Sequence, residues 1–97
     1  MFEVEMNGLN DLAREAVKEL EPVIKRRYEE KEAGSKEKEE AYYYLIQLQY
    51  IYADRRKALE SIRKNKDTEE IPRLLQNSQG IYKRCLAYYN EISGVLF

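Results

Sequence analysis

The chain has 97 residues, of which 36 % are charged and 43 % hydrophobic, and its formal net charge is −1. This length suits a single domain with a modest core, and the apolar content argues against disorder. The near-neutral net charge argues against general affinity for nucleic acids. The charge is unevenly distributed, because residues 1–48 carry −4 (8 basic, 12 acidic) and residues 49–97 carry +3 (9 basic, 6 acidic), which permits a local basic patch. With two prolines, four glycines and abundant Glu, Lys and Arg, the composition favours helices.

The first eight residues alternate between apolar and acidic side chains. Phe2, Val4 and Met6 are separated by glutamates, and Asn7-Gly8 follows. A period of two is typical of extended chain, and Asn-Gly is a turn signal. We therefore expect residues 1–8 to form an extended arm.

Helical periodicity begins after this segment and predicts a first helix at about residues 10–33, with Asn10 as its N-cap. Its apolar stripe, which includes Val17, stays in phase across Pro22, so we expect a kink at Pro22 rather than a break. Gly34 is the expected C′ residue, and Ser35 the N-cap of the next helix. Such a tight connection makes the two helices antiparallel neighbours.

A second, central helix is predicted at about residues 36–65, because no Gly or Pro interrupts residues 35–71. It would be roughly 45 Å long, too long for a chain of this size to cover on all sides. Its expected core stripe is Ala41, Tyr44, Leu45, Leu48, Ile51, Tyr52, Arg55, Ala58, Leu59 and Ile62.

A third helix is predicted at about residues 69–93, with Thr68 as its cap and Leu86 in the core. The stretch from Asn77 to Gly80 either splits this helix or is accommodated within it. The fold prediction is therefore an all-α antiparallel bundle of three to four helices with a long central helix, in a single domain over residues 1–97.

Three consecutive tyrosines in the central helix point in three directions, so they cannot all face one core. Tyr50 falls near the direction of Tyr43. Because tyrosine is enriched at interfaces, we expect Tyr42, Tyr43 and Tyr50 to bind a protein partner or a second copy of the chain. The alternative is ordinary packing with the hydroxyls in water.

Basic residues gather at the end of the central helix: Arg55, Arg56, Lys57, Arg63, Lys64 and Lys66. One interpretation is an exposed face with internal salt bridges to Asp54 and Glu60. The other is a contact with an acidic partner or with nucleic acid, which would be weak and steeply salt-dependent.

The sequence has no signature of catalysis. Without histidine and with a single cysteine, Cys85, neither a Cys-His pair nor a four-ligand zinc site can form. Glutamates three residues apart, as at Glu37 and Glu40, are expected to be solvated surface. We therefore expect no enzyme activity, cofactor, metal or small-molecule ligand.

A lone thiol and the lack of a leader pattern or an apolar run of membrane length predict a cytoplasmic protein that does not enter membranes.

The central helix carries Ile51-Tyr52 and then Arg55, Arg56, Lys57 and Leu59. Further on come Leu74-Leu75, a short polar stretch, Ile81-Tyr82 and Leu86. Over residues 40–92 this pattern resembles the helical domain of archaeal GINS replication subunits. The resemblance implies a non-catalytic scaffold that joins a replicative helicase to its partners through helical faces. A composition rich in Glu, Lys, Arg and Tyr is compatible with a thermophile.

The leading prediction is thus a non-catalytic protein-interaction or scaffold module, oligomeric, of which a GINS-like accessory subunit is one form. The alternatives are a small nucleic-acid-binding regulator that uses the basic residues 55–66, and an antitoxin or viral accessory protein.

Overall fold

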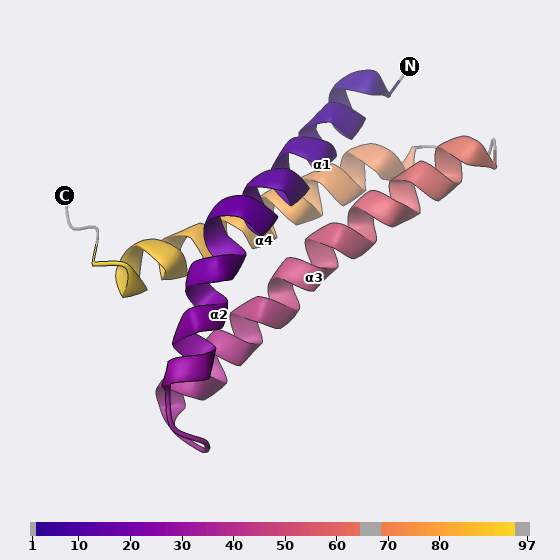
Figure 1. The fold of residues 1–97 in the computed structure, drawn as a ribbon. Coiled ribbons are helices and arrows are strands. Elements are labelled where there is room, and N and C mark those ends of the chain that lie inside the picture. Colours follow the sequence, from indigo (N-terminus) through magenta and orange to yellow (C-terminus); the bar gives the residue numbers. More distant parts are fainter. Residues whose placement is uncertain (1, 65–68, 95–97) are drawn as a thin grey trace.

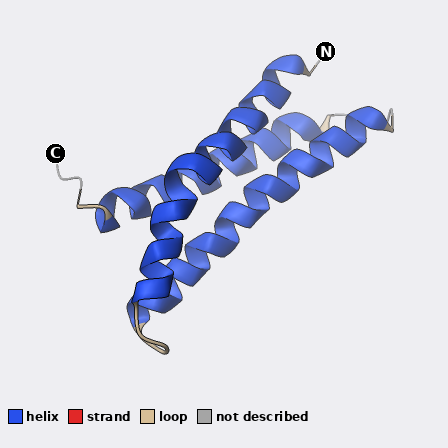
Figure 2. Cartoon of the chain, in the orientation of Figure 1, coloured by secondary structure: helices blue, strands red, loops and turns tan. Residues whose placement is uncertain are grey.

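The computed structural model describes residues 2–64 and 69–94, and these residues form three long helical rods (Figure 1). Among them there is no strand (Figure 2). The elements in chain order are α1 (Glu3–Glu15), the π-helical segment η1 (Ala16–Leu20), α2 (Glu21–Glu30), α3 (Lys36–Arg63) and α4 (Glu70–Ile92). Consecutive rods run in opposite directions, which confirms the predicted all-α antiparallel bundle. The bundle measures 47 × 30 × 18 Å, and α3 spans most of its length.

The prediction of an extended arm is wrong, because residues 3–8 belong to α1, and Asn10 lies inside this helix rather than at its cap. The apolar residues Phe2, Met6, Leu9 and Ala13 are spaced by four, three and four, which is a helical stripe. Met6 and Leu9 are buried along it, whereas Val4 points into solvent. The helical spacing of the apolar residues along α1 therefore determines the structure of residues 3–8, rather than their local alternation with glutamate.

Pro22 bends the first rod without breaking it. The rod continues from α1 through η1 into α2, and its direction changes on the way (Figure 1). Proline has no N–H to donate to the preceding turn. Just before it, the Glu21 N–H donates to the carbonyl of Ala16, five residues back. This wider turn shifts the angular spacing, so Ala16 and Leu20 are buried while Val17, predicted in the core stripe, is exposed.

The connection from α2 to α3 is short and held by side chains. The Ser35 hydroxyl accepts a hydrogen bond from the Lys38 N–H at 3.2 Å, as predicted for an N-cap. The Lys38 ammonium donates to the carbonyl of Tyr28 at 2.8 Å. Helix α2 ends at Glu30, earlier than predicted, so Gly34 lies beyond the C-cap, although it has the positive φ of 83° that favours glycine.

Helix α4 is continuous from Glu70 to Ile92, so the stretch from Asn77 to Gly80 does not split it. Ser78 in this stretch is fully buried against α3, which explains how a polar sequence is accommodated. The predicted cap Thr68 and the predicted end of the central helix at residue 65 lie outside the described residues.

The core has two parts. The larger core cluster joins the end of α1, η1, α2, α3 as far as its middle and the second half of α4. Its buried residues are Ala13, Ala16, Leu20, Ile24, Ala41, Leu48, Ile51, Ile81, Cys85 and Tyr88. Leu86 packs on it only partly buried. The smaller core cluster lies at the opposite end of the bundle and consists of Met6, Leu9, Ala58 and Ile71, with Phe2, Leu74 and Leu75 packed against it.

A buried polar contact separates the two clusters. Asp54 follows Ile51 by one helical turn, is only 6 % exposed, and accepts hydrogen bonds from the Asn77 amide and the Ser78 hydroxyl, both at 2.9 Å. Further along α3, the Ser61 hydroxyl donates to the Glu70 carboxylate. Polar groups thus join α3 to α4 where apolar residues were expected.

The buried side of α3 turns around the helix along its length. Buried positions run from Leu48 through 51, 54 and 58 to Ser61. These steps of three and four residues are on average shorter than the 3.6 residues of one helical turn. The side of α3 that faces the core therefore rotates around the helix axis by about 140° between Leu48 and Ser61. Leu59 and Ile62, predicted in the core stripe, are consequently 41 % and 42 % exposed.

Candidate functional site: two surfaces on helix α3

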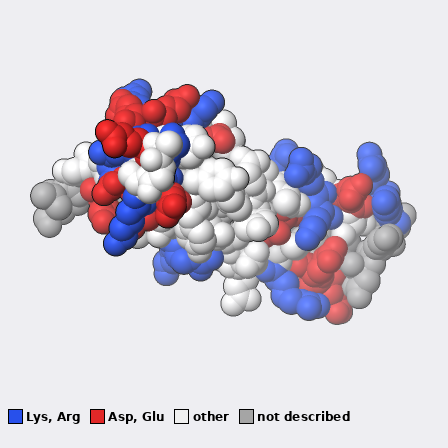
Figure 3. All heavy atoms as spheres, turned by 90° about the horizontal axis from the view of Figure 1, so that it is seen from below, with Lys and Arg blue, Asp and Glu red and all other residues white. Residues whose placement is uncertain are grey.

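The first surface is an uncharged stretch of α3. Residues 41–53 include no charged side chain, yet Tyr42, Tyr43, Gln49 and Tyr50 are exposed, and we call these four residues the tyrosine face. The three tyrosines are 54 %, 51 % and 52 % exposed, as the sequence predicted for at least one of them. Seen from below, the middle of the molecule is largely uncharged between two charged ends (Figure 3).

Aromatic contacts hold the tyrosines in place. The Tyr42 ring lies 5.8 Å from Tyr28 of α2, between ring centroids. Tyr43 meets the edge of Tyr44 at 5.0 Å, and Tyr44 in turn stacks on Tyr88 of α4 at 4.1 Å. Two of the exposed rings therefore rest on rings that belong to the packed interior, so little conformational freedom would be lost on binding.

The predicted basic cluster is divided among different partners. Arg55 is half-buried, and its Nε donates to the Asn10 side chain of α1 at 2.6 Å. Arg63 and Lys64 both approach the Glu60 carboxylate, at 3.8 and 4.0 Å. The two pairs at Glu60 agree with the salt-bridge interpretation. Asp54 does not, because it is buried and accepts hydrogen bonds from Asn77 and Ser78 instead of pairing with a cation among the described residues.

The remaining cations of the cluster are less constrained. Within residues 2–64 and 69–94, no carboxylate lies in ion-pair distance of Arg56 or Lys57. Lys66 lies outside the described residues. The cluster is therefore not one continuous basic patch on α3.

The second surface is a groove between the first rod and α3, which we call the cationic groove. It has a volume of about 600 Å³ and is lined from α1 and η1 by Asn10, Ala13, Arg14, Val17 and Lys18, and from α3 by Tyr52, Arg55 and Arg56. None of the lining residues that the structure describes is acidic, although Arg14 is ion-paired with Asp11 on the same rod. Asn10 both lines the groove and fixes Arg55, so the guanidinium stays at its edge.

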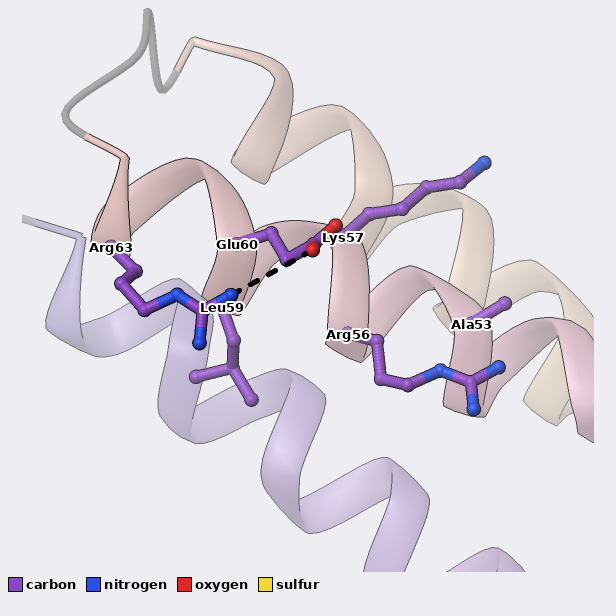
Figure 4. A pocket seen from close by; sticks show the side chains of 6 residues that line it. All are labelled: Ala53, Arg56, Lys57, Leu59, Glu60 and Arg63. Atoms are coloured by element: carbon purple, nitrogen blue, oxygen red, sulfur yellow. Dashed lines mark ion pairs between the residues drawn. The ribbon is translucent and has the colours of Figure 1, made fainter.

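A smaller hollow of about 480 Å³ continues along α3 and shares Arg56 with the groove (Figure 4). Leu59 and Arg63 lie on the side that faces α1, and Glu60 is paired with Arg63. The residues that line the groove and the hollow together include one carboxylate, Glu60, and six cations: Arg14, Lys18, Arg55, Arg56, Lys57 and Arg63.

Sequence reasoning missed Arg14 and Lys18. They lie four residues apart on the first rod and flank the exposed Val17, a spacing that places them on one side of a helix. That pattern was readable, but its pairing with Arg55 and Arg56 depends on how the rods cross.

The one cysteine of the chain, Cys85, is buried and has no activated thiol. Burial raises the pKa of the Cys85 thiol to about 11, which keeps it protonated and unreactive near neutral pH. Burial and the nearby Glu21 carboxylate, which accepts a hydrogen bond from the hydroxyl at 3.3 Å, raise the pKa of Tyr52. In the parts of the chain that the structure describes, no three potential metal ligands gather.

Within the same described ranges, no helix combines the length and apolar character that crossing a membrane requires. Searches against models of protein families, characterised proteins and solved structures found no match for this chain.

Proposed function

We propose that this chain is a non-catalytic protein-interaction module that associates with a second copy of itself through the tyrosine face. The observation that carries the proposal is the absence of charge from residues 41–53, although four of their side chains are exposed. Helix surfaces in water normally carry charged residues. Depletion of charge together with enrichment in tyrosine is instead typical of the centre of a protein interface.

Self-association suits this surface for an electrostatic reason. In a twofold-symmetric dimer the same patch meets itself, so a patch whose charges have one sign would repel its copy. The tyrosine face has no charge, and it covers about 12 Å of α3, or about two helical turns. Tyrosine rings and glutamine side chains can also hydrogen-bond to their own copies across such an axis.

The test is the oligomeric state of the full chain at about 100 µM, far above the dissociation constant of a submicromolar dimer. Sedimentation should give a dimer for the native chain and a monomer for Tyr43→Ser/Tyr50→Ser. Because both rings are half exposed, the unfolding temperature at low concentration should barely change. Val4→Ser, which alters a more exposed apolar residue on α1, is the matched control and should remain dimeric.

Two results would overturn the proposal: a native chain that is strictly monomeric at this concentration, or a double variant that still dimerises. Unfolding of the double variant would show that Tyr43 and Tyr50 support the fold instead.

The nucleic-acid alternative has weaker support, because Arg55, Arg63 and Lys64 already have partners within the chain. Replacing Arg55, Arg56 and Arg63 by Glu tests it, since duplex binding that survived would not use this cluster. A GINS-like scaffold, an antitoxin or viral accessory role, and a cytoplasmic location remain predictions. A scaffold role would be compatible with the proposed module.

A further inference from the structure

The cationic groove combines exposed apolar side chains with an excess of positive charge. We propose that it binds an acidic amphipathic helix of a partner protein. The inference extends the proposed interaction role to a second surface. The cationic groove includes none of the tyrosine-face residues, so an experiment can disprove either proposal without affecting the other.

The apolar floor arises from the two irregularities of the fold. The π-helical segment turns Val17 outward, and it is 50 % exposed. The rotation of the buried side of α3 does the same to Leu59, which lies two turns beyond Tyr52 and projects from the same side of the helix. Val17 and Tyr52 thus line the groove from both rods, and Leu59 lines the hollow that continues from it.

The edges of the groove are positively charged on both rods. Arg14 and Lys18 project from α1 and η1, and Arg55 and Arg56 project from α3. The bond to Asn10 uses Nε of Arg55 and leaves the Nη groups, which suit a carboxylate with two oxygens. Arg14 is already ion-paired with Asp11, so among the described residues Lys18, Arg56 and the Nη groups of Arg55 are the cations left for a ligand.

These features favour a helix over other partners. A helix laid along the groove would place apolar residues on Val17, Tyr52 and Leu59, and acidic residues on its two flanks would meet cations of both rods. A nucleic-acid duplex would satisfy the cations with its phosphates, but its phosphate backbone offers little apolar surface for the floor. A second copy of this chain is less suitable, because its strongly acidic segment, residues 29–40, is largely polar and carries almost no apolar side chains at helical spacing.

The probe is a designed, fluorescently labelled helical peptide of about 18 residues, with Leu along one face and Glu on both flanks. Its matched partner has Lys in place of each Glu. Anisotropy titrations with the full native chain should show saturable binding of the Glu peptide and none of the Lys peptide.

Two sets of variants test the two properties separately. Lys18→Glu/Arg56→Glu should weaken binding of the Glu peptide by about tenfold or more, whereas Lys83→Glu/Lys25→Glu, which reverses two exposed lysines elsewhere, should change it by less than about twofold. Val17→Ser/Leu59→Ser should also weaken binding, and this loss should persist at high salt because it does not depend on charge. Circular dichroism checks that each variant keeps its fold.

Four outcomes would overturn the inference. One is no binding of the Glu peptide at about 100 µM, and another is equal binding of both peptides. A third is binding that ignores Val17→Ser/Leu59→Ser and is displaced by duplex DNA, which would identify a phosphate-binding surface. The last is a change of oligomeric state in the Lys18→Glu/Arg56→Glu variant, which would identify a second copy as the occupant.

Discussion

The two ends of the bundle are built differently. The larger core cluster is closed by aromatic rings, with Tyr44 stacked on Tyr88, and it is enclosed by all three rods. Among the described residues, the smaller core cluster has four buried members and one aromatic neighbour, Phe2. Over the smaller cluster, Leu59 and Ile62 remain exposed. The first half of α3 is thus packed among aromatic rings, whereas its second half leaves aliphatic side chains exposed.

The largest expected effect comes from the larger core cluster. Leu48 is fully buried, so Leu48→Ala should lower the free energy of unfolding by about 2–5 kcal/mol. Leu86, predicted in the core, is only partly buried, and Leu86→Ala should cost less. Urea denaturation of both variants measures the difference. A loss of under about 0.5 kcal/mol for Leu48→Ala would contradict the packing described for this cluster.

The next effect concerns the polar contact between the clusters. Asp54→Ala leaves the Ser78 hydroxyl and the Asn77 amide without their acceptor, which should cost about 1–3 kcal/mol in chemical denaturation. Asp54→Asn keeps one acceptor oxygen in a side chain of the same shape, so its loss should be smaller. Equal losses in the two variants would show that the negative charge, rather than the hydrogen bonds, matters.

Alkaline pH should weaken the larger core cluster selectively. Burial, as the first cause in each case, raises the pKa of Tyr44, Tyr82 and Tyr88 above the ordinary value of 10.0. The folded chain then holds these protons more tightly than the unfolded chain does. Their contribution to stability is complete below pH 10 and declines as the pH rises above it.

This alkaline loss can be followed by urea denaturation between pH 8 and pH 11. Tyr52, whose pKa is also raised, belongs to the same cluster, so Tyr52→Phe should make the decline less steep. No tyrosine is found among the described residues of the smaller cluster. An unchanged slope in Tyr52→Phe would contradict the assignment of this proton to the folded state.

The smallest expected effects on stability concern two helical glycines, Gly80 of α4 and Gly8 of α1. A Cβ at Gly80 would lie 3.6 Å from the nearest atom, at the Arg84 guanidinium, so Gly80→Ala should stabilise α4 by up to about 1 kcal/mol. A Cβ at Gly8 would come within 3.0 Å of the Leu75 side chain, beside the smaller cluster. Gly8→Ala should therefore gain less or lose stability. Thermal unfolding ranks the pair, and a larger gain at Gly8 would reverse the comparison.

The sequence predicted what depends on local chemistry. The Ser35 cap, the unbroken central helix and the outward direction of Tyr43 follow from residue type and spacing, and the structure confirms them. Features that depend on how rods cross were missed. The helical N-terminus needs partners from α4, and exposure of Leu59 follows from the rotation of the buried side of α3. The cationic groove pairs Lys18 with Arg56, which are 38 positions apart in the sequence.

Asp54 also fixes how α3 is aligned along α4. If α3 slid by one helical turn, about 5.4 Å, this carboxylate would leave Ser78 and meet either Leu74-Leu75 or Ile81-Tyr82. Each shifted alignment buries a charge against apolar groups, whereas a core of leucines alone would tolerate the slide. One buried acid thus fixes the alignment of α3 along α4.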